Sequence, residues 1–524
     1  MTEVSVHQRP RILIVDLGSQ YTLLIEKAFR ELGYRSAILD PKKAVKWAAS
    51  NEVWLVVLSG GPKSVTDPGR IEIPSEIFEI NAPIFAICYG MQYVAQLYGG
   101  EVGSVQDHRG YGPETIKTKN GSKLFANLPV EQPVWASHGD TVARVPDGFT
   151  VTARTSKTEA IAAMEGKRKN GQMTYCVQFH PEVHHTQYGR QIFNTLAQLS
   201  FLKKDWSPRD MVQHLQNAII EGIGDRDTIT GFSGGVDSST LARIITRSKL
   251  LKKRAHFILI DGGQLREGEL EEIRENAKLA GVENLIVVDA KKRFAKAFGK
   301  TTDAEEVRRV FRRLYSQILQ ETALLLTGGD LKKIVLLQGT LAPDRIESGA
   351  TGGALIKTHH NVNLDTGEMQ QLHPLQDLFK YEVRALARAL RLPKRIWNRQ
   401  PSPGPGLFIR APGHRKTPEI IAVVRWADAR TKEILIAHRW YGRVSQLVVY
   451  YENVNLVGVR GDSRHYDSPI VVRAVKTIDF MTADGVIFPP KVQKEIISAL
   501  TQHPHISRVH FDPTPKPPGT TEPE

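Results

Sequence analysis

Two short segments of the chain carry side chains that could together perform nucleophilic catalysis. Cys88 follows an apolar run and precedes a glycine-containing turn, and His180 and Glu182 stand two residues apart after a second apolar run, in "QFHPEV". A cysteine nucleophile needs a nearby imidazole as base, and the imidazole needs a third group to orient it. We therefore expect Cys88, His180 and Glu182 to meet at one site. The alternative is an ordinary histidine at the mouth of a loop.

The backbone around Cys88 suits such a role. A strand–turn–helix elbow exposes a nucleophile at the carboxyl end of a strand, and the helix N-terminus favours a thiolate there. The glycine loop "LSGGP" (58–62) follows another apolar run, and its amide groups could bind an oxyanion together with the N–H of Tyr89. Cys176 lies inside "YCVQF" instead, and we expect it to be a small buried apolar residue.

These motifs resemble the class I glutamine amidotransferase family. "SGGP", "CYGMQ", "SHGD" (137–140) and "QFHPEV" stand in that family's order over residues 10–200. The resemblance implies that Cys88, His180 and Glu182 hydrolyse glutamine to glutamate and ammonia. It also implies oxyanion donors at Gly60 and Tyr89, and glutamine contacts at Gln92 and Asp140.

A second motif, "GFSGGVDSS" (231–239), places small and hydroxyl-bearing residues between a predicted strand and a predicted helix. It lacks the Walker spacing, yet its amide and hydroxyl groups suit a phosphate chain. Asp237 would repel bare phosphate, so we expect a bridging Mg²⁺. The alternative is a serine- and glycine-rich helix cap.

The motif resembles the loop of ATP pyrophosphatases, which transfer AMP to an acceptor oxygen and release pyrophosphate. The resemblance assigns ATP contacts to Ser233, Gly234, Gly235, Val236, Asp237, Ser238 and Ser239. Sulfur transfer by such enzymes generally needs further cysteines, and this chain has only Cys88 and Cys176. Ammonia is therefore the expected nucleophile, and the first domain would make it.

Further motifs extend the resemblance over nearly the whole chain, to the GMP synthase family. They include "QGTLAPDRIESG", "IKTHHNV", "PGPGLFIR", "VGVRGDSRHYD", "DFMTADG" and "KPPGTTE". The resemblance implies ATP-dependent adenylation of xanthosine 5′-monophosphate, its amination to GMP, and a C-terminal dimerisation domain. Matched positions place Lys357 at the ATP phosphates. They place Gly404, Pro405, Gly406, Lys516, Thr520 and Glu522 at the acceptor, although a proline-rich tail could equally be a passive extension.

Departures from the family pattern collect around the expected acceptor site. They are Gly263, Arg312, Gln400, Ser402, Thr521 and Pro523. They leave two alternatives open: a divergent GMP synthase, or a relative that aminates a different or modified purine-type acceptor by the same chemistry.

Alternating strand and helix patterns predict how these residues are positioned. Strand–loop–helix patterns begin at residues 11, 53 and 83 and again at 226, and further strands are expected at 254–263, 284–290 and 333–340. This pattern predicts two parallel-sheet α/β domains in series, at 10–200 and 208–399. A smaller α+β dimerisation domain is expected at 400–524, after the proline- and glycine-rich segment 399–410.

Composition, cysteine content and net charge limit the classes of protein to which this chain could belong. The 524 residues are 41% hydrophobic and 24% charged, with no apolar run long enough to span a membrane and no visible secretory signal. Two cysteines favour a reducing cytoplasm. The net charge of +14 lies mostly between residues 201 and 400, where "KKRFAKAFGK" (291–300) could be a solvated helix face. A nucleic-acid-binding protein on an inactive scaffold stays open, but it would have no use for the two intact motifs.

Overall fold

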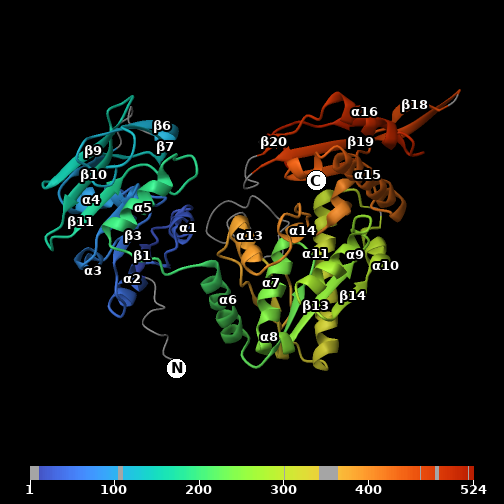
Figure 1. The fold of residues 1–524 in the computed structure, drawn as a ribbon, viewed down its shortest axis with the longest axis horizontal. Coiled ribbons are helices and arrows are strands. Elements are labelled where there is room, and N and C mark those ends of the chain that lie inside the picture. The colour runs from blue at the N-terminus through green and yellow to red at the C-terminus, as the bar shows by residue number, and fades with distance from the viewer. Residues whose placement is uncertain are drawn as a thin grey trace. The chain divides into compact units, whose positions relative to one another are not determined.

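The computed structural model describes residues 11–103, 110–299, 301–341, 364–460, 462–477, 483–516 and 518–524. The chain forms two compact units, residues 1–207 and 208–524, and each is described here by itself (Figure 1).

The first unit is built on a mixed sheet that has nine strands in the described part of the chain. Their order is β2-β1-β3-β4-β11-β10-β9-β6-β7, parallel from β2 to β11 and antiparallel from β11 to β7. The strands are β1 (Ile12–Val15), β2 (Ser36–Leu39), β3 (Leu55–Leu58), β4 (Ile84–Ile87), β6 (Gly110–Thr118), β7 (Glu131–His138), β9 (Phe149–Thr155), β10 (Ile161–Lys167) and β11 (Met173–Val177), and β5 (Glu101–Gly103) pairs separately with β8 (Thr141–Arg144). The helices are α1 (Thr22–Leu32), α2 (Pro41–Ala48), α3 (Ser75–Glu79), α4 (Tyr89–Leu97) and α5 (Gly189–Leu199).

Side chains of the central strands alternate between two buried faces. Ile12 and Ile14 pack with Phe29 of α1 and Phe193 of α5, whereas Leu13 belongs to the core that includes residues of α2, α3 and α4. This period of two is what a strand covered on both faces requires. The parallel strands therefore end together at one edge, where Cys88 and Gln178 follow adjacent strands.

The second unit begins with a parallel sheet of order β14-β13-β12-β15-β16. Its strands are β12 (Asp227–Gly231), β13 (Ala255–Asp261), β14 (Leu285–Asp289), β15 (Ile334–Leu337) and β16 (Gln370–Leu372). The connecting helices are α6 (Pro208–Ile223), α7 (Val236–Arg247), α8 (Lys249–Lys253), α9 (Glu269–Leu279), α10 (Lys291–Phe298), α11 (Ala304–Thr327), η3 (Leu331–Lys333), α13 (Lys380–Ala389) and α14 (Lys394–Trp397). The strand order reverses at β12, which is where open α/β sheets bind ligands.

A second, largely antiparallel sheet follows in the same unit, with β17 (Gln446–Tyr451), β18 (Leu456–Arg460), β19 (Ser463–Lys476), β20 (Asp484–Gly485) and β21 (Ile506–Phe511). Its helices are η5 (Gly406–Arg410), α15 (Pro418–Ala437), η6 (Tyr441–Arg443) and α16 (Pro490–Leu500). One hydrophobic core runs from Ile258 through Phe408 to Val449, so it joins both sheets. The predicted boundary near residue 400 therefore stays a prediction.

The observed elements confirm the predicted α/β fold class, with an α+β segment at the C-terminus. Residues 291–298 of the basic run form α10, which buries Phe294 and Phe298 while Lys291 and Arg293 pair with Asp261 and Glu321. It is thus a charged helix face, as one of the two alternatives expected. Within the described ranges, no helix combines the length and apolarity that crossing a membrane requires.

Candidate functional site

Cys88 occupies a strained elbow between β4 and α4. Its φ of 51° and ψ of −105° are unusual for a residue with a side chain, and its N–H donates to Val177 O at 2.8 Å. Two residues later, Gly90 is packed so closely that a Cβ there would stand 2.9 Å from the Cβ and carbonyl oxygen of Leu58. The elbow therefore exists because a small residue lets the helix start directly against β3.

His180 and Glu182 lie beside this elbow, as the sequence predicts. Nδ1 of His180 is 2.7 Å from Oε1 of Glu182, and both side chains are almost fully buried. Burial disfavours the imidazolium, but the Glu182 carboxylate and the hydrogen bond to Cys88 together raise the pKa of His180 well above its ordinary value. The contacts thus favour an imidazolium held between a carboxylate and the cysteine sulfur.

One backbone bond and one ring contact hold His180 in place. Its backbone N–H donates to Trp135 O at 2.9 Å, and the ring of Tyr21 meets the imidazole edge-on at 4.9 Å between centroids. Gly60 also lies against the His180 ring, because a Cβ on Gly60 would stand 3.1 Å from Cε1 of His180. The glycine loop expected to supply an oxyanion donor is therefore next to the His180 imidazole.

The two residues predicted to contact glutamine are joined directly. Nε2 of Gln92 donates to the backbone oxygen of Asp140 at 2.8 Å and approaches Oε1 of Gln178 at 3.4 Å. Gln178 in turn donates to the Cys88 sulfur at 3.7 Å. These groups lie near the Cys88 sulfur, but their role toward a substrate stays a prediction. Cys176 is fully buried, and burial raises the pKa of its thiol well above the ordinary value, which fits the expected apolar role.

The motif at 231–239 forms the predicted loop between β12 and the start of α7. Gly234 has a φ of 68°, and Ser233 Oγ lies 3.2 Å from Ser238 Oγ and accepts from the Gly235 N–H at 3.4 Å. Gly235 precedes the first turn of α7, whose amide groups lack intrahelical acceptors. This arrangement suits an anion at the helix N-terminus.

Asp237 provides the test for a divalent cation. Its Oδ2 pairs with Lys380 Nζ at 2.5 Å, while Oδ1 is buried with no partner within the described residues. In the described ranges, no group of three or more histidine, cysteine or acidic residues could hold a metal ion by itself. Mg²⁺ commonly binds through one carboxylate plus substrate phosphates, so the free oxygen of Asp237 fits the expected ion.

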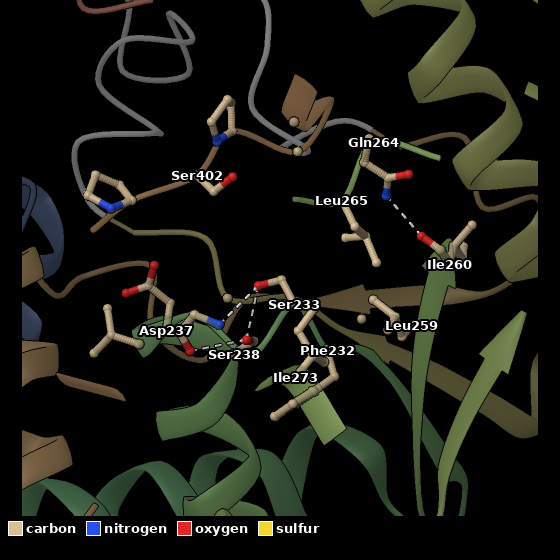
Figure 2. Close-up of a pocket in the computed structure, with 18 of the residues that line it drawn as sticks. Phe232, Ser233, Asp237, Ser238, Leu259, Ile260, Gln264, Leu265, Ile273 and Ser402 are labelled. Atoms are coloured by element: carbon tan, nitrogen blue, oxygen red, sulfur yellow. Dashed lines mark hydrogen bonds between the residues drawn. The ribbon is translucent and has the colours of Figure 1, made fainter. Parts of the chain in front are cut away.

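A cavity of ≈ 310 Å³ adjoins this loop, which contributes Ser233, Asp237 and Ser238 to its wall. Figure 2 shows Ser402 across the pocket from Ser233 and Ser238, and Leu259, Ile260 and Gln264 along another wall. Residues 399–404 and Gly406 therefore form a further wall of the cavity.

The expected acceptor residues are not all brought to this cavity. Gly404 and Gly406 line it, with Pro405 between them, but Lys516, Thr520 and Glu522 do not. The Glu522 carboxylate accepts from Arg410 at 3.0 and 3.1 Å and from Gln446 at 2.7 Å. Thr520 Oγ1 donates to Glu522 O at 2.5 Å, and the backbone of Lys516 pairs with Ala483. The tail is thus packed against the rest of the second unit. Lys357, the expected ATP contact, lies outside the described residues.

Three of the departures from the family pattern have structural contacts here. Gly263 adopts a φ of 96° and accepts from Arg425 at 2.7 Å. The Gln400 amide bonds to the backbone of Tyr441, Val444 and Leu447. Ser402 lines the cavity, whereas nothing in the structure explains Arg312, Thr521 or Pro523.

Sequence reasoning missed two cations that adjoin the loop at 231–239. Lys380 begins α13 and pairs with Asp237, and Arg399 donates to Ser233 O at 3.0 Å. A lysine at the first position of a helix opposes the helix dipole, so its placement there was a weak clue. Arg399 gave no such clue, because its partners lie far away in the chain.

Comparisons with known proteins agree with these two sites. The family model "Glutamine amidotransferase class-I" matches residues 13–198, and "GMP synthase C terminal domain" matches residues 433–523. A protein of Thermobifida fusca named GMP synthase [glutamine-hydrolyzing] is 40% identical over 98% of this chain and 97% of its own length. A Bacillus cereus protein of the same name is 38% identical over 98% and 99%.

A solved structure of a candidate GMP synthase component from Thermoplasma acidophilum is 30% identical. It covers 37% of this chain and 95% of its own, with a TM-score of 0.33.

Proposed function

The chain belongs to the family of glutamine-hydrolysing GMP synthases, and we propose how its residues divide this activity between two sites. The family activity couples glutamine hydrolysis to the ATP-dependent amination of a nucleotide. The first unit carries a thiol, an imidazole and a carboxylate in contact, and the second carries a phosphate-binding loop. We assign ammonia production to the first and nucleotide adenylation and amination to the second.

In the first unit, Cys88 acts as the nucleophile. Its sulfur attacks the side-chain carboxamide carbon of glutamine, and the N–H groups of Gly60 and Tyr89 bind the developing oxyanion. His180, oriented by Glu182, gives its proton to the departing ammonia. Water, deprotonated by His180, then hydrolyses the thioester to glutamate. Gln92 and Asp140 hold the substrate at the edge where β4 and β11 end.

In the second unit, the acceptor is xanthosine 5′-monophosphate. Its C2 oxygen attacks the α-phosphorus of ATP, and the pyrophosphate leaves toward residues 233–239, with Lys357 as a further phosphate contact. Ammonia then displaces AMP at C2 to give GMP. Asp237 would hold Mg²⁺ through its unpartnered Oδ1, and the bound ion would supply charge neutralisation for the leaving pyrophosphate. Lys380 holds the Asp237 carboxylate in place through its ion pair.

The observation that carries the first assignment is the contact chain from Cys88 through His180 to Glu182. Cys88→Ala should abolish GMP formation from glutamine and preserve GMP formation from added ammonia, because Cys88 has no part in adenylation. Both rates are measured by release of pyrophosphate. Loss of both activities in a folded variant would contradict the division into two sites.

The acceptor itself needs a separate test. Gly263 and Gln400 are held by backbone contacts in this structure, so two of the departures have roles that do not require a new acceptor. We therefore favour xanthosine 5′-monophosphate over a modified purine nucleotide. Higher kcat/KM for another purine nucleotide, in the presence of ATP, Mg²⁺ and ammonia, would reverse this choice.

A homodimer formed through the C-terminal sheet and a cytoplasmic location also belong to this proposal. The C-terminal family match and the presence of only two, buried, cysteines support them. Light scattering of the purified chain would decide the first, because a monomer at micromolar concentration would exclude it.

A further inference from the structure

Arg399 makes an unusual set of contacts beside the phosphate-binding loop. One guanidinium nitrogen donates to the Ser233 carbonyl at 3.0 Å, a second pairs with Glu269 at 2.6 Å, and the third lies 3.1 Å from Glu272. The Arg399 side chain is only 14% exposed. Because two carboxylates already balance its charge, Arg399 is poorly suited to bind phosphate directly and well suited to hold the loop.

The carbonyl that Arg399 holds determines where an amide points. In a trans peptide the C=O and the following N–H point in opposite directions, so fixing Ser233 O also fixes the N–H of Gly234. The fully buried Asn276 does the same one residue later, by donating to Gly234 O at 3.1 Å. Two successive amide groups of the loop are therefore fixed by side chains outside it.

The next residue, Gln400, bonds in the other direction, to the C-terminal sheet. Its Oε1 accepts from the Leu447 N–H at 2.9 Å, and its Nε2 donates to Tyr441 O at 3.2 Å and Val444 O at 3.4 Å. Leu447 follows Gln446, which donates to Glu522 in the tail at 2.7 Å. Consecutive residues of one loop thus contact the phosphate-binding motif and the strand that holds the tail.

We propose that Arg399 and Gln400 are positioning residues, and that they form a bridge through which the C-terminal sheet sets the geometry of the phosphate-binding loop for adenylation. Gln400 acts through Arg399, because its own amide is used by β17 and η6. The inference rests on the proposed assignment of residues 233–239 to ATP. It adds that the acceptor-side sheet and the ATP loop are mechanically linked within the second unit.

Ammonia-dependent GMP synthesis at varied ATP tests the bridge without using the first unit. Arg399→Gln should raise the KM for ATP about tenfold or more, since it removes hydrogen bonds of a charged group. Gln400→Ala should raise it about threefold to tenfold. Arg395→Gln is the matched control, because Arg395 makes an exposed pair with Glu275 nearby.

The double variant carries the decisive result. If Gln400 acts through Arg399, Gln400→Ala should change the KM for ATP by less than about twofold when Arg399 is already glutamine. If the two substitutions instead multiply their effects on the KM for ATP, the bridge is refuted. A wild-type KM for ATP in both single variants would refute it as well.

Two controls separate the remaining readings. Arg399→Lys should be as impaired as Arg399→Gln, and full recovery would show that Arg399 binds phosphate as a simple cation. Asp237→Asn tests the underlying assignment. If it leaves ATP turnover unchanged, the loop assignment itself is wrong, whereas its inactivity beside normal Arg399 and Gln400 variants removes only the bridge.

Discussion

Glu522→Gln should destabilise the second unit through a buried cation rather than through the acceptor. Arg410 is the largest fully buried side chain among the described residues, and Glu522 accepts two of its hydrogen bonds. Asp428 takes a third at 3.1 Å and also lies 3.5 Å from Arg266. Two cations thus face two carboxylates, and the substitution leaves one buried positive charge unbalanced.

The size of the effect follows from burial. Removing one partner of a buried pair costs about 3–5 kcal/mol. Glu522 is 14% exposed and glutamine keeps its shape, so about 3 kcal/mol is expected. At about 2.1 cal/mol/K per residue, the unit at 208–524 unfolds with about 0.7 kcal/mol/K of entropy. The midpoint of its thermal transition should therefore fall by about 4–5 °C.

Differential scanning calorimetry at one fixed scan rate measures this shift, because it separates the transitions of the two units. Glu433→Gln is the control, since Glu433 pairs with Arg430 on the surface and should shift the midpoint by less than about 1 °C. Adding Arg410→Gln to Glu522→Gln should recover part of the loss, because it restores the balance of buried charge. Equal midpoints for Glu522→Gln and Glu433→Gln would refute the reasoning.

Asp237→Asn should lower kcat/KM for ATP about a hundredfold, while Cys88 still reacts with an alkylating glutamine analogue; formation of ADP by the wild type would contradict the pyrophosphate assignment. Gly90→Ala should cost the first unit about 1–3 kcal/mol, seen in its own thermal transition, because the new Cβ would crowd Leu58. Burial lowers the pKa of His138 from 6.5 to about 4, so the unfolded chain takes up this proton first. The stability of the first unit should therefore fall by about 3 kcal/mol as the pH falls from 6.5 to 4, and His138→Asn should remove this loss; an unchanged pH profile would show that His138 does not titrate in this way.

The sequence by itself predicted which residues form the two candidate sites, and it predicted the order of the elements. Cys88 and His180 follow apolar runs that had to become adjacent strand ends, and the alternating pattern predicted a parallel sheet on which such ends meet. The loop at 231–239 could also be predicted from the sequence, because its strand, its small residues and its helix are consecutive in the chain. Both inferences depend on local sequence patterns, because the order of apolar runs, turns and amphipathic segments along the chain predicts the order of strands, loops and helices.

Only the tertiary structure decided which distant residues complete these sites. Lys380 pairs with Asp237 across 143 positions, and Arg399 reaches Ser233 across 166, so no local pattern could place them. The tail behaved likewise: the resemblance placed Glu522 at the acceptor and the proline-rich composition left a passive extension open, whereas the ion pair with Arg410 shows that Glu522 balances a buried charge. The physical reason is that burial and charge balance are properties of the packed interior, where partners are chosen by three-dimensional proximity and not by sequence spacing.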